Sequence, residues 1–184
     1  MLRVIILLAL ELLLRSPAAA AAQDLRLEAR LDSATRVQVE AALASARGEG
    51  LPTEPLVQKA LEGASKGAPG ARIVAAVATV LADLRRAREA LGLAAAEDEL
   101  VAAAAALRAG ATPSMIGEMR RVAPHGAVAV PLAVFTDLVA GGMGADAAWR
   151  SVAELARKGG NDEAFLRLRD RLEPAPPGSA PEAP

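Results

Sequence analysis

Apolar residues recur along the chain at the spacing of an amphipathic helix, in short segments separated by glycines. The longest segment, 71–91, has its large aliphatic residues on one side and most of its charges on the other. Comparable patterns predict helices over 33–47, 55–65, 71–91, 97–109, 113–122, 131–139, 145–157 and 162–172. Residues 23–32 are a charged lead-in and a candidate extension of the first helix. The pattern predicts an all-α fold of about seven or eight short helices.

Seven glycines mark the boundaries between these segments. They are Gly50, Gly67, Gly92, Gly110, Gly126, Gly142 and Gly159, spaced by 17, 25, 18, 16, 16 and 17 residues. Glycine readily ends a helix in the left-handed conformation, so each unit is interpreted as a turn followed by one short helix. Most of these glycines have a large apolar residue six positions later, namely Leu56, Ile73, Ile116, Leu132 and Phe165. Gly92 and Gly142 depart from this rule, with Asp98 and Ala148 at the sixth position.

Residues that favour helix starts support this division. Thr112 is a candidate N-cap with Pro113 at the first helical position, and Asn161 precedes two acidic residues in a first turn. A unit of 16 to 18 residues is about half of a two-helix repeat of roughly 34 residues, so residues 110–140 would form one helix pair. The signature residues of tetratricopeptide and ankyrin repeats are absent. A compact bundle and a short helical-repeat array both remain open.

The two ends of the sequence differ from the helical part. Residues 1–22 contain an early arginine, a short apolar run and a series of alanines, the order of a secretory signal peptide, with cleavage expected before Gln23. Glu11 is unusual within such an apolar run, which leaves an uncleaved amphipathic helix as the alternative. Residues 174–184 are rich in proline and alanine and are expected to be disordered. The expected organisation is a signal peptide over 1–22, a helical domain over 23–173 and this tail.

The amino-acid composition supports the all-α fold class and argues against nucleic acid as a partner. Alanine is abundant, whereas the chain has only two phenylalanines, one tryptophan and no tyrosine, which favours helices over strands. Without residues 1–22 the chain keeps 19 basic and 21 acidic residues (21 − 2 and 22 − 1), mixed along its length. No basic face for nucleic acid is evident. The expected location is periplasmic or extracellular, with no stable membrane span after cleavage.

Two sequence features could suggest catalysis, and both have a simpler interpretation. Residues 63–67 read Gly-Ala-Ser-Lys-Gly, the pattern that holds a nucleophilic serine between a strand and a helix in some hydrolases. Here an amphipathic helical segment precedes Ser65, so we interpret the motif as a helix C-terminus capped by Gly67. His125 is the only histidine and is expected in an exposed turn. We therefore expect a protein that is not an enzyme and has no metal site or cofactor.

Three side chains are candidates for contact with a partner. Trp149 is the only tryptophan, and single tryptophans serve either as core anchors or as contact hot spots. Met115 and Met119 lie four residues apart and could line an adaptable groove or fill the core. The expected function is an exported, non-enzymatic interaction or scaffold protein of the bacterial cell envelope that binds another envelope protein or a peptide. The alternative is a periplasmic carrier of a small apolar ligand or lipid.

Overall fold

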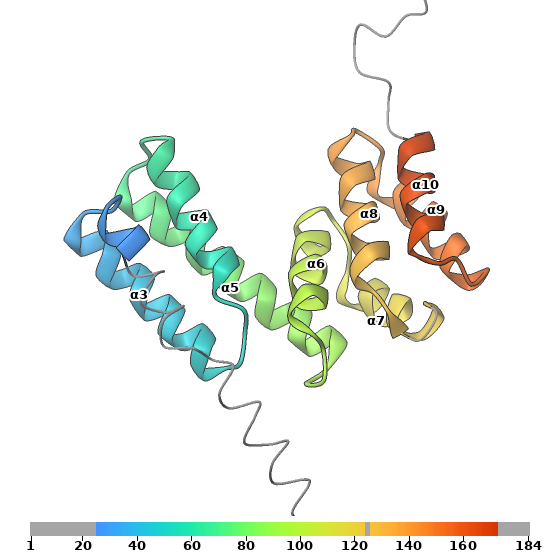
Figure 1. The fold of residues 1–184 in the computed structure, drawn as a ribbon, viewed down its shortest axis with the longest axis horizontal. Helices are drawn as coiled ribbons and strands as arrows, with labels where there is room; N and C mark the ends of the chain where they lie inside the picture. The colour runs from blue at the N-terminus through green and yellow to red at the C-terminus, as the bar shows by residue number, and fades with distance from the viewer. Residues whose placement is uncertain (1–24, 124–125, 173–184) are drawn as a thin grey trace, which may run out of the picture. The chain divides into compact units, whose positions relative to one another are not determined.

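The computed structural model describes residues 25–123 and 126–172, and these residues form helices and turns without strands (Figure 1). The main helices are α3 (Ser33–Gly48), α4 (Glu54–Ser65), α5 (Gly70–Leu91), α6 (Glu97–Arg108), α7 (Pro113–Val122), α8 (Ala129–Ala140), α9 (Ala145–Arg157) and α10 (Asp162–Leu172). The all-α prediction is confirmed. The predicted signal peptide and the predicted disordered tail lie outside the described residues.

The predicted helix boundaries agree closely with the structure. The bounds of α7, α9 and α10 are those expected from the sequence, and α8 begins two residues earlier than expected. The lead-in differs, because residues 25–28 form a short helix of their own and the chain turns at 29–31 before α3. Asp32 then caps α3, with its Oδ1 atom accepting a hydrogen bond of 2.9 Å from the backbone N–H of Thr35.

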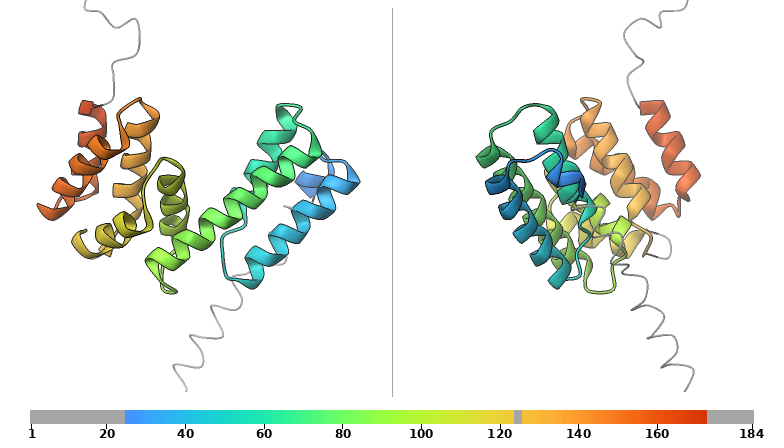
Figure 2. Two further views of the ribbon diagram at one scale, coloured as in Figure 1. Left: turned by 180° about the vertical axis from the view of Figure 1, so that it is seen from behind. Right: turned by 60° about the vertical axis from the view of Figure 1, so that its left-hand side comes forward.

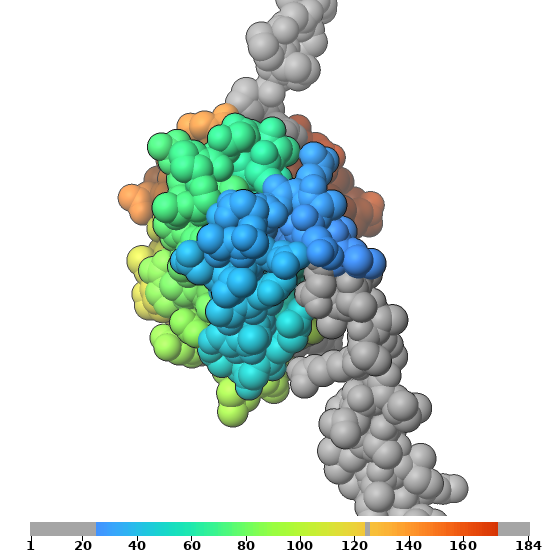
Figure 3. All heavy atoms as spheres, turned by 90° about the vertical axis from the view of Figure 1, so that its left-hand side faces the viewer, coloured from blue at the N-terminus to red at the C-terminus, as the bar shows by residue number. Residues whose placement is uncertain are grey.

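The chain divides into two compact units, the first ending at Leu81 and the second beginning at Ala82, within α5. In the first unit α3 packs against α4. Its core is aliphatic and includes Leu27, Val39, Leu43, Leu56, Val57, Ile73 and Val77. Figure 3 shows a face of this unit that α3 largely forms, in blue to cyan. The single helical domain over 23–173 stays a prediction.

The start of α5 approaches α3 very closely in the first unit. A Cβ atom added to Gly70 would lie 2.0 Å from the Oγ1 atom of Thr35, so no larger residue fits there without movement. Thr35 is itself buried, and its hydroxyl donates a 2.6 Å hydrogen bond to Asp32. Gly63 is similarly close to Ile73, which brings α4 against α5. Because glycine has no side chain at these two contacts, α3, α4 and α5 can pack tightly.

In the second unit, alternate helices lie side by side. Helix α6 packs against α8 and α8 against α10, while α7 packs against α9, and α9 also contacts α8 and α10 (Figures 1 and 2). This arrangement is consistent both with a stack of helix pairs and with a compact bundle. Helix α8 is apolar along nearly its whole length, in keeping with its position between α6, α9 and α10.

The left-handed backbone predicted for these glycines is confirmed at every position, although Gly126 lies three residues beyond the C-cap of α7 rather than at the helix end. All seven glycines singled out in the sequence have positive φ angles, from 65° to 103°. After α8, for example, the N–H of Gly142 donates to the carbonyl of Val139 and the N–H of Met143 to that of Leu138, each at 3.0 Å. This paired arrangement is the Schellman motif. The apolar residues six positions after the glycines are buried, namely Leu56, Ile73, Ile116, Leu132 and Phe165. The repeat therefore encodes a helix end followed by a core anchor.

Candidate functional site

The three side chains proposed as contacts lie in or near the core of the second unit. Trp149 is 8% exposed and meets Phe135 edge-on, with ring centroids 5.8 Å apart and planes at 80°. Met119 is fully buried. Met115 is half-buried, and its sulfur accepts a 3.4 Å hydrogen bond from the backbone N–H of Thr112. Trp149 and Met119 thus act as packing residues here, and Met115 keeps partial exposure.

The serine motif lies at a helix end, as expected. Ser65 is in the last turn of α4, and its hydroxyl donates a 2.9 Å hydrogen bond to the carbonyl of Glu62. Gly67 follows with a φ angle of 65°. Hydrogen bonds from Lys66, and then from Lys59, lower the pKa of Glu62 to about 2, so this carboxylate stays ionised. His125 lies outside the described residues.

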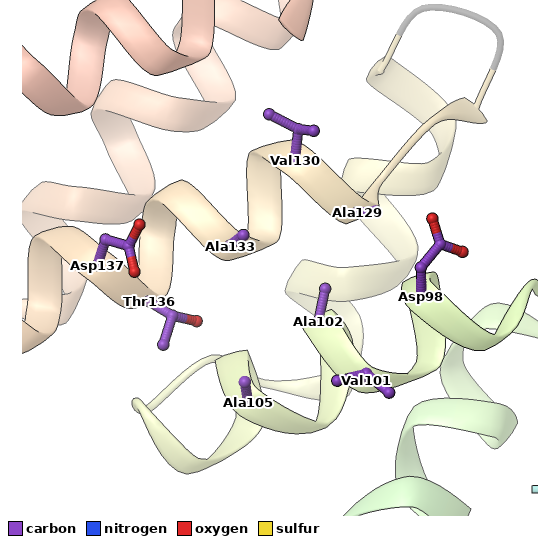
Figure 4. A pocket seen from close by; sticks show the side chains of 9 residues that line it. All are labelled: Asp98, Val101, Ala102, Ala105, Ala129, Val130, Ala133, Thr136 and Asp137. Carbon is purple, nitrogen blue, oxygen red and sulfur yellow. The ribbon is translucent and has the colours of Figure 1, made fainter. Parts of the chain in front are cut away.

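A groove lies between α6 and α8 in the second unit. Its volume is about 520 Å³ and it is open to solvent rather than enclosed. Nine residues from the two helices line it: Asp98, Val101, Ala102, Ala105, Ala129, Val130, Ala133, Thr136 and Asp137 (Figure 4). On each helix they recur every three or four positions, so one face of α6 and one face of α8 form the two walls.

Alanine side chains create this groove. In α6 the run of alanines at 102–106 has two faces, since Ala103 and Ala104 are buried while Ala102 and Ala105 line the groove. On the opposite wall Ala129 and Ala133 are equally short. Helices in contact normally fill the space between them with larger side chains, and methyl groups leave part of it open. The run of alanines is visible in the sequence, where it favours a helix but does not indicate which alanines stay uncovered.

The larger side chains of the lining are apolar and accessible. Val101 is 39% exposed, an uncommon degree of exposure for a valine within a helix contact. Val130 is half-buried on the facing wall. The hydroxyl of Thr136 donates a 2.9 Å hydrogen bond to the carbonyl of Leu132 within its own helix. The walls therefore present carbon atoms to the solvent, and burying such a surface is favourable.

The charged lining residues are both acidic. Asp98 lies at the end of the groove near Ala129, and Asp137 lies at the opposite end near Ala105 (Figure 4). The Oδ1 atom of Asp98 accepts a 2.9 Å hydrogen bond from the N–H of Glu99. Asp137 is 3.7 Å from a guanidinium nitrogen of Arg169. The groove is thus apolar in the middle and acidic at its two ends.

An ion pair fixes the start of α6 in the second unit. Arg120 of α7 binds Glu99 with both terminal nitrogens, at 3.0 and 2.9 Å, and also donates to the carbonyl of Gly126 at 3.1 Å. Burial raises the pKa of Glu99, but the hydrogen bonds from Arg120 and from the N–H of Ala96 outweigh it, so that the pKa lies below its ordinary value. The same arginine thereby links α6, α7 and the turn before α8.

A second acidic anchor lies at the other end of α6. Asp83 of α5 is only 1% exposed and pairs with Arg86 and, at 3.4 Å, with Arg108 of α6. A buried carboxylate that lost these partners would be strongly destabilising, so the pairs hold α6 in position. The two anchors hold both ends of the helix that forms the α6 wall of the groove.

Other kinds of site are not found among the described residues. No group of three or more histidine, cysteine, aspartate or glutamate residues in 25–123 and 126–172 could hold a metal ion. Within the same ranges, every helix is too short or too polar to cross a bilayer. No protein-family model, curated protein or solved structure matches this chain. The α6–α8 groove is the candidate functional site because its walls present accessible apolar side chains that a partner could cover.

Proposed function

We propose that this chain is an exported, non-enzymatic interaction protein that binds a polypeptide partner in the α6–α8 groove. The observation that carries the proposal is an apolar, solvent-open groove of about 520 Å³ between two neighbouring helices. Helical-repeat proteins bind partners along the concave surfaces between their helices, and covering an apolar groove removes its carbon atoms from water, which is favourable. The anchors at both ends of α6 support a preformed site, which lowers the entropic cost of binding.

Export remains part of the proposal on the evidence of residues 1–22 alone. The test is the mass of the protein isolated from the envelope fraction of its own host. A mass corresponding to residues 23–184 supports export with cleavage before Gln23. The mass of the whole chain in the cytosolic fraction would refute it.

Site-specific photo-crosslinking tests the docking function. A photoreactive phenylalanine analogue replaces Ala133, which is exposed and lines the groove, and in a matched control it replaces Ala78, which is exposed on α5 and does not line it. The expected result is one defined polypeptide adduct at position 133 and none at 78. The adduct should disappear when Ala105 is also replaced by tryptophan to fill the groove. Equal labelling at both positions would refute docking at this site.

The apolar lining also favours a second candidate, a carrier of a small apolar molecule. Ligand pockets commonly have volumes of roughly 300 to 1,000 Å³, and this groove lies within that range. Such ligands are usually enclosed over most of their surface, whereas this groove is open, so the polypeptide is the stronger proposal. Solvent extraction of protein purified without detergent distinguishes the two. A stoichiometric apolar compound of a few hundred daltons would support the carrier.

A further inference from the structure

The groove has an exposed aspartate at each end, and at the first end a second carboxylate lies next to it. At the first end Glu97 and Asp98 are adjacent and exposed, and among the described residues neither forms an ion pair with a basic side chain. At the second end Arg169 lies 3.7 Å from Asp137 but also contacts Asp170 at 2.9 Å. One cation is therefore shared by two carboxylates. Each end therefore carries an exposed aspartate, and no basic side chain lines the groove between them.

The spacing of these ends sets the length of the occupant. The lining runs from Asp98 to Ala105 on α6 and from Ala129 to Asp137 on α8, which is seven and eight residue steps. At about 1.5 Å per residue, these distances are about 10 to 12 Å along the helices. Two cations seven residues apart on one face of a helix have the same separation. A partner about two helical turns long would therefore reach both acidic ends.

The lining also favours a helical backbone over an extended one. An extended peptide in an apolar groove would bury N–H and C=O groups that need hydrogen-bond partners. The walls supply almost none, because seven of the nine lining side chains are alanine, valine or a threonine already bonded to its own helix. A helix satisfies its backbone internally and presents only side chains. The short alanines leave room for large apolar residues such as leucine.

We propose, on the basis of the docking function above, that the partner segment is an amphipathic α-helix with large apolar residues on one face and a basic residue at each end of that face, about seven residues apart. The apolar residues fill the space between Ala102 and Ala133, and the two cations lie against Asp98 and Asp137. The acidic ends select the charge of the partner, and the apolar floor supplies most of the affinity.

Synthetic helices test this proposal with the full chain. The cationic probe is a fluorescein-labelled, alanine-based peptide of about 20 residues, long enough to be helical, with two lysines seven residues apart and two leucines between them on the same face. The anionic probe has glutamates in place of both lysines. Fluorescence anisotropy measures the two affinities. We expect the cationic probe to bind about tenfold more tightly in low salt, and this preference to shrink in about 0.5 M salt because the ion pairs are exposed.

Variants of the protein assign the preference to the groove. D98N/D137N should reduce the preference for the cationic probe to less than about threefold. D146N/D162N is the matched control. It also removes two exposed carboxylates from helices of the second unit, but these carboxylates do not line the groove. This variant should therefore keep the preference for the cationic probe. Ala133→Lys places a cation at an exposed position of the α8 wall. It should lower the affinity for the cationic probe more than the affinity for the anionic probe. Circular dichroism checks that each variant is folded.

The outcomes separate this inference from the docking function. Equal binding of the two probes, abolished in both cases by Ala133→Trp, would refute the basic partner and leave the groove as a docking site. If neither probe bound but a polypeptide adduct formed at position 133, the basic helical partner would be refuted and the docking function would stand. If Ala133→Trp and Ala133→Lys both left probe binding unchanged, the probes would bind outside the groove. That result would refute the docking site as well as the basic helical partner. A charge preference that D98N/D137N removes and D146N/D162N keeps would support the inference.

Discussion

Replacing Gly142 by alanine isolates the energetic role of the glycine at the end of α8. Gly142 has a φ angle of 96°, and a Cβ atom added there meets nothing within 4 Å. The substitution therefore causes no clash, and its cost comes from the backbone conformation alone. Gly144 is the matched control. It lies in the same turn, has a φ angle of −61° and is equally open.

The magnitude follows from two opposing effects. Forcing a residue other than glycine into the left-handed region costs about 1 to 2 kcal/mol. Replacing glycine by alanine also restricts the unfolded chain, which stabilises the protein by about 0.4 to 1 kcal/mol. Gly142→Ala should therefore lower the free energy of unfolding by about 1 kcal/mol. Gly144→Ala should be close to neutral, because its extended backbone suits alanine and only a weak N-cap preference is lost.

Urea unfolding followed by circular dichroism measures both variants. A difference of about 1 kcal/mol corresponds to about 2 to 4 °C in Tm for a chain of this size. The free energy of unfolding of Gly142→Asn should lie between those of the wild type and the alanine variant, because asparagine adopts the left-handed conformation more readily than alanine. If Gly142→Ala and Gly144→Ala had the same stability within about 0.3 kcal/mol, the left-handed backbone would not be what ends α8, and the explanation of the glycine pattern would be wrong.

Three further predictions concern the cores and an ion pair. Gly70→Ala should destabilise the protein by about 1 to 3 kcal/mol in urea unfolding, because its Cβ would overlap Thr35, whereas Gly48→Ala meets nothing and should be neutral or slightly stabilising. Met119→Ala should cost about 2 to 5 kcal/mol, since the side chain is fully buried; a cost below about 1 kcal/mol would contradict its place in the core. The lowered pKa of Glu99 contributes stability that is fully present above its unfolded pKa of about 4.3 and is lost as the pH falls through the folded value. Glu99→Gln should therefore reduce the loss of stability between pH 7 and pH 3, and an unchanged pH profile would refute that contribution.

The helix boundaries could be predicted from the sequence because they depend on local backbone energies. A left-handed turn favours glycine whatever lies beyond the next few residues, and the caps at Thr112 and Asn161 are formed with backbone groups three positions away. The burial of the residue six positions after most glycines follows from the same local regularity. These features needed no knowledge of which helices meet.

Tertiary packing alone decided which residues form the groove. Ala102 and Ala103 are adjacent and chemically identical, yet the first lines the groove and the second is buried, because they lie on different faces of α6. The packing of α8 and α9 likewise brings Trp149 against Phe135 and places it in the core. Such contacts join residues far apart in sequence, and their geometry depends on the volumes of all the side chains between them. The local sequence pattern therefore determined where each helix begins and ends. Which side chains line the accessible groove was decided only by the packing of the helices.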